Sequence, residues 1–269
     1  MKKLVKLSTI LFLLVLAFVP INQAKAITVE EIKDRGEIVM GTSADFPPFE
    51  WVVLEDGKEK EVGVDIELAQ KIAEKLGVQL KIVNTSFDSL VQSVKTGKVD
   101  MVLAGMAYTE ERAKEVAFSE VYYSNANQFV TSKEIADHFQ SFEDIEKHRV
   151  GVQKGSIQEG LAKEFIPNAE LTMMSDNPDL IQAILVNRLD LALFDSLVAQ
   201  QFVAQHPDKL TILSDLEIEN QDQGISVVTA KESQDLLAVI NEVLKEQMAE
   251  GTIDQWVDHY IQLNAQGSN

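Results

Sequence analysis

The order of strand-like and helix-like segments restricts this chain to one class of fold. Residues 66–76 carry apolar side chains at helical spacing, with Asp65 placed to cap the start of the helix and a glycine placed to end it. The alternating segment 78–83 (VQLKIV) follows as a strand. After a second helical segment near 87–95, the apolar run 99–105 (VDMVLAG) is typical of a buried parallel strand. Repeated strand–helix–strand units predict an α/β fold.

The same alternation begins again in the second half of the chain. The segment 149–153 (RVGVQ) is predicted to be a strand, and Ser156 with Glu159 forms a capping box for the helix that follows. Asn177 is predicted to cap the next helix, with a proline at its first position. The apolar run 189–195 (LDLALFD) reads as a further buried strand. Two sets of units predict two lobes, each a mostly parallel sheet flanked by helices.

The first 26 residues differ from the rest of the chain. Lysines at the start precede a nearly continuous apolar run over residues 7–19, and Ala24-Lys25-Ala26 is a small-x-small cleavage signal. We interpret residues 1–26 as a secretory signal peptide. An uncleaved membrane anchor is the alternative, although the apolar run is short for crossing a bilayer.

Charge and composition exclude several kinds of partner. Residues 1–26 contain four lysines and no acidic residue, so the remaining chain has a formal net charge of −23 and would repel the phosphates of nucleic acid. There is no cysteine, and the four histidines stand far apart in the sequence. We therefore expect no disulfide, no metal site and no lipid attached through an N-terminal cysteine. No cofactor motif occurs, and no cofactor is expected.

Polar and aromatic residues follow the ends of the predicted strands. In open α/β sheets, ligands bind beyond the carboxyl ends of the strands, where loops meet helix N-termini. Five segments occupy such positions, namely 43–46, Phe87, 105–112, 153–157 and Asp195. The sequence therefore predicts that these segments form one ligand site.

Arg112 and Asp195 place opposite charges at two of these positions. Arg112 falls in the first turn of a helix capped by Thr109, where the helix macrodipole disfavours a cation unless an anion is bound nearby. A salt bridge to Glu110 is the alternative. Asp195 ends an apolar strand, where its charge needs a partner. That partner is either the ammonium group of a ligand or the first amides of a helix beginning near Ser196.

Taken together, the two charges describe a zwitterionic ligand. Arg112 suits a carboxylate and Asp195 suits an ammonium group, while Phe46 and Phe87 can enclose the remainder and exclude water. Ser156 offers its hydroxyl group and nearby helix amides to the same carboxylate, although a plain N-cap is the commoner role of serine. Packing in the hydrophobic core is the alternative role of the two aromatic rings.

Five segments carry a resemblance to a known family. The chain resembles, in the same order, the polar amino-acid-binding proteins of bacterial ABC importers, and the likeness spans nearly all of the sequence after residue 26. Its most specific part runs from TEER to FSEVYY. The segments are GTSADFPPFEW (41–51), VGVDIELAQKIAEKLG (62–77), FDSLVQSVKTGKVDMVLAGMAYTEERAKEVAFSEVYY (87–123), VGVQKGSIQEG (150–160) and LDLALFD (189–195).

The resemblance implies a type II periplasmic-binding-protein fold. Two lobes would be joined by crossover strands near Ser124 to Asn127 and Glu219 to Gln223, and an amino acid would bind in the cleft between them. The implied division is a signal peptide (1–26), lobe 1 (27–123 and 224–269, including the C-terminal helices) and lobe 2 (124–223).

The resemblance also implies a role for each site residue. Arg112 matches the arginine that binds the α-carboxylate, and Asp195 matches the acid that binds the α-ammonium group. Phe46 and Phe87 match the aromatic pair around the ligand side chain, and Gly105 matches a backbone carbonyl that accepts from the ammonium group. The implied ligand-binding set is Ser43, Phe46, Phe87, Gly105, Ala107, Arg112, Gln153, Ser156, Ile157 and Asp195.

Three residues depart from the family pattern. Ser43 stands where relatives that bind basic amino acids or glutamine often have aspartate, Ala107 replaces a hydroxyl residue that usually touches the ligand, and Val64 replaces a phenylalanine. The first two changes leave the identity of the amino acid open. Asp45 or Glu50 could supply the missing acidic group.

The expected function is capture of a free polar or basic amino acid by closure of the two lobes. The protein is expected to be a monomer of the periplasm or cell surface that delivers its ligand to a membrane ABC permease, and not an enzyme. One alternative is a dehydratase acting on a cyclic amino or keto acid, with acids such as Asp45, Glu50 and Asp195 as proton carriers. The other is an amino-acid sensor module.

Overall fold

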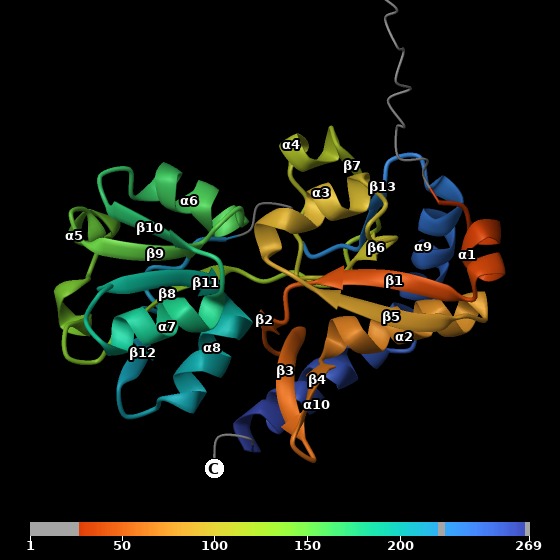
Figure 1. Cartoon of the computed structure of the whole chain (residues 1–269). Coiled ribbons are helices and arrows are strands. Elements are labelled where there is room, and N and C mark those ends of the chain that lie inside the picture. Colours follow the sequence, from red (N-terminus) through yellow and green to blue (C-terminus); the bar gives the residue numbers. More distant parts are fainter. Residues whose placement is uncertain (1–26, 220–223, 267–269) are drawn as a thin grey trace, which may run out of the picture.

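The chain folds into two lobes, each built around its own five-stranded sheet (Figure 1). The computed structural model describes residues 27–219 and 224–266. The predicted signal peptide, 1–26, lies outside the described residues. Within those residues, no helix combines the length and apolar character needed to cross a bilayer.

Lobe 1 contains strands from both ends of the sequence. Its sheet has the order β5-β1-β6-β13-β7, in which β1 runs parallel to β5 and β6, whereas β13 runs antiparallel to β6 and β7. A small antiparallel sheet, β2-β3-β4, extends from this lobe. The strands are β1 (Glu37–Thr42), β2 (Asp45–Phe46), β3 (Glu50–Glu55), β4 (Lys58–Val62), β5 (Gln79–Asn84), β6 (Met101–Val102), β7 (Val116–Phe118) and β13 (Val228–Ala230).

Lobe 2 repeats the arrangement with one continuous stretch of chain. Its sheet has the order β10-β9-β11-β8-β12, with β9 parallel to β10 and β11 and with β8 antiparallel to β11 and β12. The strands are β8 (Asn127–Ser132), β9 (Arg149–Gln153), β10 (Glu170–Met174), β11 (Leu191–Asp195) and β12 (Leu210–Ile212). The predicted α/β architecture is therefore observed in both lobes. Each sheet was expected to be mostly parallel but is mixed, with two parallel and two antiparallel strand pairs.

Helices surround both sheets (Figure 1). Those of lobe 1 are α1 (Val29–Arg35), α2 (Val64–Leu76), the 3-10 helix η1 (Phe87–Ser89), α3 (Leu90–Lys95), α4 (Glu110–Ala113), α9 (Gln234–Ala249) and α10 (Thr252–Gln266). Those of lobe 2 are the 3-10 helix η2 (Ala136–His138), α5 (Phe142–Ile145), α6 (Ile157–Phe165), α7 (Asn177–Leu185) and α8 (Ser196–Gln205).

Two connections join the lobes, one between β7 and β8 and the other between β12 and β13. They lie against each other through single antiparallel bridges, Tyr123 with Ile225 and Asn127 with Ile218. The predicted crossovers fall on these two connections, and residues 220–223 of the second lie outside the described residues. The limits given for each lobe remain a prediction.

The α2 segment shows how the apolar pattern builds the core. Its buried side chains, which include Leu68, Ile72 and Leu76, form one stripe in the main hydrophobic cluster of lobe 1. The helix ends at Gly77, which has a left-handed backbone (φ 73°) that favours glycine. The predicted stripe and stop are therefore observed.

The prediction that Asp65 caps α2 is wrong. The N-cap is Gly63, and Asp65 is the second residue of the helix and is fully buried. Its carboxylate accepts hydrogen bonds from the backbone N–H of Gly105 (3.2 Å) and the hydroxyl of Tyr122 (2.5 Å). The Asp65 side chain therefore forms tertiary contacts and does not cap the helix, because burial of a carboxylate is costly unless hydrogen-bond donors surround it.

Two further helix starts can be compared with the sequence. Ser156 caps α6 as predicted, with its Oγ accepting from the N–H of Glu159 (3.3 Å), but the Glu159 carboxylate accepts from Gly155 instead of closing the capping box on Ser156. The cap of α7 was predicted one residue too late. Asp176 is the N-cap, and Asn177 is already helical.

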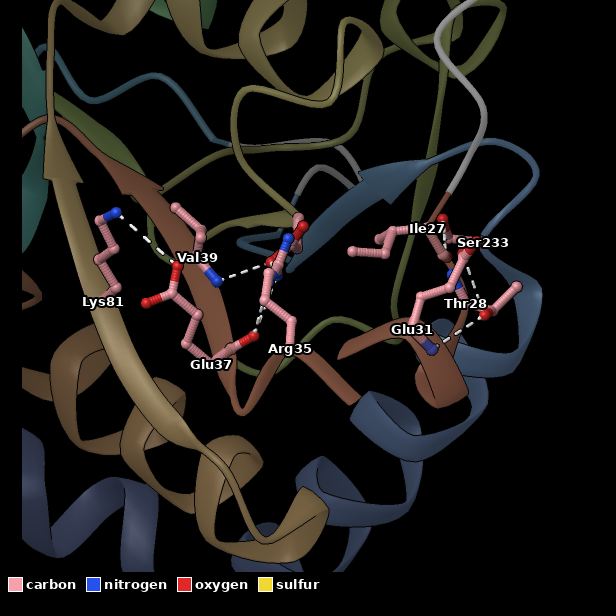
Figure 2. A network of polar contacts seen from close by, with 9 residues as sticks. Ile27, Thr28, Glu31, Arg35, Glu37, Val39, Lys81 and Ser233 are labelled. Atoms are coloured by element: carbon pink, nitrogen blue, oxygen red, sulfur yellow. Dashed lines mark hydrogen bonds and ion pairs between the residues drawn. The ribbon is translucent and has the colours of Figure 1, made fainter. Parts of the chain in front are cut away.

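Polar contacts fix the first described residues to the rest of lobe 1 (Figure 2). The hydroxyl of Ser233 donates to the carbonyl oxygen of Ile27 (2.8 Å). Arg35 forms an ion pair with Asp100, whose buried carboxylate also accepts from the N–H of Val39 in β1 (2.7 Å). These contacts hold α1 against the sheet on the side of lobe 1 that faces away from lobe 2 (Figure 1).

Candidate ligand-binding site

A small cavity lies between the lobes. It is lined by Phe46, Phe87, Gly105, Ala107 and Arg112 of lobe 1, by Gln153, Ser156, Ile157, Gln158 and Asp195 of lobe 2, and by Ile225 of the second connection.

Nine of the ten residues predicted for the site line this one cavity. Ser43 is the exception. It is buried (2% exposed), and its hydroxyl donates to the Asp45 carboxylate (3.3 Å). Ser43 therefore contacts an acidic neighbour and not the cavity.

Two lining residues were not predicted. Gln158 follows Ile157 in α6, and its amide donates to the side-chain oxygen of Asn127 in β8 (2.8 Å). Its place next to a predicted residue was an available signal. Ile225 gives no local signal, because only its bridges to Ala107 and Tyr123 bring it to the site.

The short helix α4 places Arg112. Thr109 is its N-cap, as predicted, and accepts from the N–H of Arg112 (3.1 Å). The guanidinium donates to the carbonyl oxygens of Ala107 (2.5 Å) and of Gly155 in lobe 2 (2.8 Å), and it lies 5.4 Å from the ring centre of Phe87. No carboxylate of the described residues forms an ion pair with it, so the alternative bridge to Glu110 is not formed.

The electrostatics of Arg112 favour an anion. Burial lowers the pKa of its guanidinium to about 10, so the group remains a cation at neutral pH. Its two observed acceptors are neutral carbonyls, which use only part of its five N–H donors. A carboxylate in the cavity would supply the missing countercharge.

Asp195 fulfils one of the two roles that the sequence left open, the capping of a helix. It is the N-cap of α8, accepting from the N–H of Leu197 (2.9 Å), and it also accepts from the Asn125 amide (3.1 Å). The side chain nevertheless lines the cavity. Burial raises the pKa of its carboxyl group to about 7, because none of these donors carries a full positive charge. An ammonium group would favour the ionised form.

The two aromatic side chains that line the cavity also pack in the hydrophobic core, which is the alternative role predicted for them. Phe87 is 7% exposed and belongs to a lobe 1 cluster, whereas Phe46 packs against clusters of both lobes. Gly105 makes the approach of Phe46 possible. A Cβ atom there would lie 2.5 Å from the ring, and its φ of +55° also favours glycine.

An acidic group lies behind the Phe46 wall. Glu50 is directly opposite Phe46 in the β2–β3 pairing, so the two side chains share a face of that sheet. It is fully buried, and no donor among the described residues bonds to its carboxyl oxygens. Burial, followed by the charges of Asp65 and Asp45, raises its pKa well above the ordinary value. A buried carboxyl group without a countercharge is a favourable place for a cation.

Comparison with known proteins supports the same class of molecule. The sequence model of the bacterial extracellular solute-binding proteins, family 3, matches residues 38–263. The arginine-binding extracellular protein ArtP of Bacillus subtilis is 36% identical over 224 residues, which cover 82% of this chain and 84% of the relative.

Solved structures show the same two-lobed fold. The amino acid ABC transporter substrate-binding protein AbpA of Streptococcus pneumoniae, bound to L-arginine, has a TM-score of 0.84 and 36% identity, covering 88% of this chain and 99% of that one. The ancestral amino acid-binding protein AncCDT-1, a precursor of cyclohexadienyl dehydratase, has a TM-score of 0.78 and 31% identity, covering 87% and 99%. The type II periplasmic-binding-protein fold is confirmed. This chain therefore belongs to family 3 of the bacterial extracellular solute-binding proteins.

Proposed function

We propose that the protein captures a free basic amino acid, with arginine as the first candidate, and delivers it to the membrane permease of an ABC importer. One observation carries the proposal. Arg112 and Asp195, which have opposite charges and come from different lobes, line the same cavity.

The lining groups fit the parts of an amino acid. The α-carboxylate would accept from the Arg112 guanidinium and from the exposed amides at the start of α6, near Ser156. The α-ammonium group would donate to Asp195 and to the carbonyl of Gly105. The aliphatic part of the side chain would lie between Phe46 and Phe87, which exclude water and strengthen both ionic contacts.

A basic side chain is favoured by the acidic group behind the cavity. Asp45 already accepts three hydrogen bonds, whereas no N–H group of the described residues donates to Glu50, whose charged neighbours are acids with Asp65 first among them. Glu50 would therefore replace the aspartate that is missing at Ser43. Two proteins similar to this chain are named for arginine or were solved with it, which supports the same ligand class.

Ligand binding would favour the closed arrangement of the lobes. A ligand shifts a conformational equilibrium only by its difference in affinity for the two states. An amino acid that bonds to Arg112 in lobe 1 and Asp195 in lobe 2 makes all its contacts only when the lobes are closed. The permease would recognise this closed form.

The remaining expectations belong to the same proposal. Residues 1–26 would direct export and then be removed, so that the mature protein acts outside the cytoplasm. It would act as a monomer and would not change its ligand chemically. Long incubation with arginine followed by mass spectrometry tests the last point, because a dehydratase or other enzyme would deplete the free amino acid.

The direct test is a thermal-shift screen of the twenty amino acids against residues 27–269. A ligand that binds only the folded state raises its stability by mass action, so the shifts rank the ligands. We expect arginine and lysine to give the largest shifts, with calorimetric Kd on the order of micromolar. A screen in which no amino acid raises the melting temperature would refute the proposal.

A further inference from the structure

Helix α7 of lobe 2 receives its N-terminal cap from lobe 1. Its own N-cap residue, Asp176, makes no side-chain capping bond, and Pro178 has no N–H to offer. The N–H of Asn177, at the start of the helix, donates to the carboxylate of Asp45 in β2 (2.7 Å). An anion at this position also interacts favourably with the helix dipole.

The same carboxylate holds a side chain of the cavity wall. The Oδ2 atom of Asp45 that caps α7 also accepts from the amide of Gln153 (3.0 Å), and Oδ1 accepts from Ser43 (3.3 Å). Asp45 is 8% exposed and is not one of the residues that line the cavity. One lobe 1 carboxylate thus bonds to two separate elements of lobe 2, β9 and α7.

The other polar contacts between the lobes are of different kinds. The ion pair of Lys154 with Asp88 (2.7 Å) has partly exposed side chains, and such pairs contribute little in water. The bond from Arg112 to the Gly155 carbonyl belongs to the proposed ligand site. Asn264 in α10 bonds to Gln201 and Gln205 in α8 away from the cavity, but these bonds join neutral amides (3.1 and 3.0 Å). Asp45 differs from all of these contacts in being a buried carboxylate acceptor, and bonds to an ionised acceptor are the stronger class.

We propose that Asp45 is a positioning residue that latches the closed lobes by capping α7 across the cleft and by fixing the Gln153 amide. The latch slows the release of the ligand without touching it. This inference rests on the proposed function, because it assumes that a ligand leaves when the lobes open.

The lobe movement can be measured directly. The chain has no cysteine, so spin labels can be attached to cysteines introduced at two chosen sites. Lys114 after α4 and Glu164 in α6 are exposed, and residues of both helices line the groove at the mouth of the cleft. Double electron–electron resonance on Lys114→Cys/Glu164→Cys protein then gives the distance between the lobes with and without arginine.

Release of arginine is measured by stopped-flow displacement in the same background. We expect Asp45→Ala protein to release arginine at least tenfold faster than the parent protein, and its spin labels to lie further apart. Asp45→Asn protein should have a release rate and label distances between those of the parent and of Asp45→Ala. Asp176→Ala is the matched control, because it removes an acid from the same helix start that makes no capping bond. It should leave the release rate and the distances unchanged.

Two results would overturn the latch. One is an Asp45→Ala protein whose release rate equals that of the parent. The other is faster release with an unchanged distance distribution, which would mean that Asp45 acts on the ligand and not on the lobes. The distances between the spin labels can also be compared in ligand-free parent protein and ligand-free Asp45→Ala protein, where no amino acid is present. A failure of arginine to bind is thereby distinguished from a failure of the latch.

Discussion

Arg112 and Asp195 show how one side chain can serve both the fold and the site. Arg112 bonds to carbonyls of both lobes, and Asp195 caps α8, yet both side chains line the cavity. Neither is paired with an opposite charge among the described residues, so a zwitterion could supply the missing opposite charge to each of them. The sequence offered cap and ligand contact as alternatives for Asp195, whereas a helix cap that also lines the cavity permits both.

The first prediction concerns Arg112. Arg112→Ala should weaken arginine binding by a factor of a hundred or more, because a desolvated ligand carboxylate left without its partner costs about 3 kcal/mol. Isothermal titration calorimetry measures the change. The control is Lys154→Ala, which removes another cation at the lobe interface but only an exposed ion pair, and should change affinity less than threefold. Equal losses in both variants would show that the site has been misplaced.

The second prediction is that Glu50 determines the preference of the site for a ligand with a cationic side chain. Glu50→Gln should weaken binding of arginine at least tenfold, whereas binding of citrulline, its neutral analogue, should change little. The reason is that the carboxyl group is buried without a countercharge and is stabilised in its ionised form only by a cation. Calorimetry with both ligands gives the ratio of affinities. A similar loss for arginine and citrulline would place the guanidinium elsewhere.

At the scale of the element, periodic patterns were read more reliably than single caps. The buried stripe of α2, the strand β9 and the N-caps Thr109 and Ser156 are observed as predicted. Asp65 was misassigned because sequence spacing cannot show that Gly105 and Tyr122 are the donors it meets. The N-cap of α7 was predicted at Asn177 and not at Asp176 for a related reason, since the carboxylate that accepts from the first N–H of this helix comes from the other lobe.

The Gly63 position leads to a third prediction, about the start of α2. Gly63 has a φ of +131°, and a Cβ atom there would lie 2.1 Å from the carbonyl oxygen of Phe49. Gly63→Ala should therefore lower the free energy of unfolding by about 3 kcal/mol or more. Urea unfolding followed by circular dichroism measures the loss.

Gly57 provides the control for this steric argument. It also has a positive φ (+75°), but a Cβ atom there meets nothing within 4 Å. Gly57→Ala should cost only the backbone strain, about 1 kcal/mol. If the two alanine variants lose the same stability, the contact with Phe49 does not constrain the turn into α2.

At the scale of the whole molecule, the two lobes and nine of the residues that line the cavity between them could be predicted, because the polar and aromatic residues after the strand ends are recognisable in the sequence. What could not be predicted is how the lobes meet. Ile225 reaches the cavity from a connection more than a hundred residues away from Ala107, its bridge partner. Ser43 was assigned to the site by family position, yet its hydroxyl donates to Asp45, the carboxylate that accepts from Gln153 of lobe 2. Such placements depend on tertiary geometry, which no local pattern records.

The last prediction follows from the buried acids as a group. Burial raises the pKa of Asp195 from its ordinary 3.8 to about 7, and the pKa values of Asp45 and Asp65 to about 6. Between pH 4 and 7 the ligand-free folded protein therefore binds more protons than the unfolded chain. Its free energy of unfolding should fall as pH rises through this window, by up to ~1.4 kcal/mol per pH unit from Asp195 alone.

Asparagine at position 195 isolates the contribution of one acid, because it keeps a capping side chain but cannot ionise. Urea unfolding of ligand-free protein at pH 5 and pH 7.5 should show a smaller loss of stability in Asp195→Asn than in the parent. Glu59→Gln makes the same change in net charge on the exposed β4 strand and should retain the parental slope. If both variants show the same pH dependence, general charge repulsion and not burial of Asp195 governs the loss of stability.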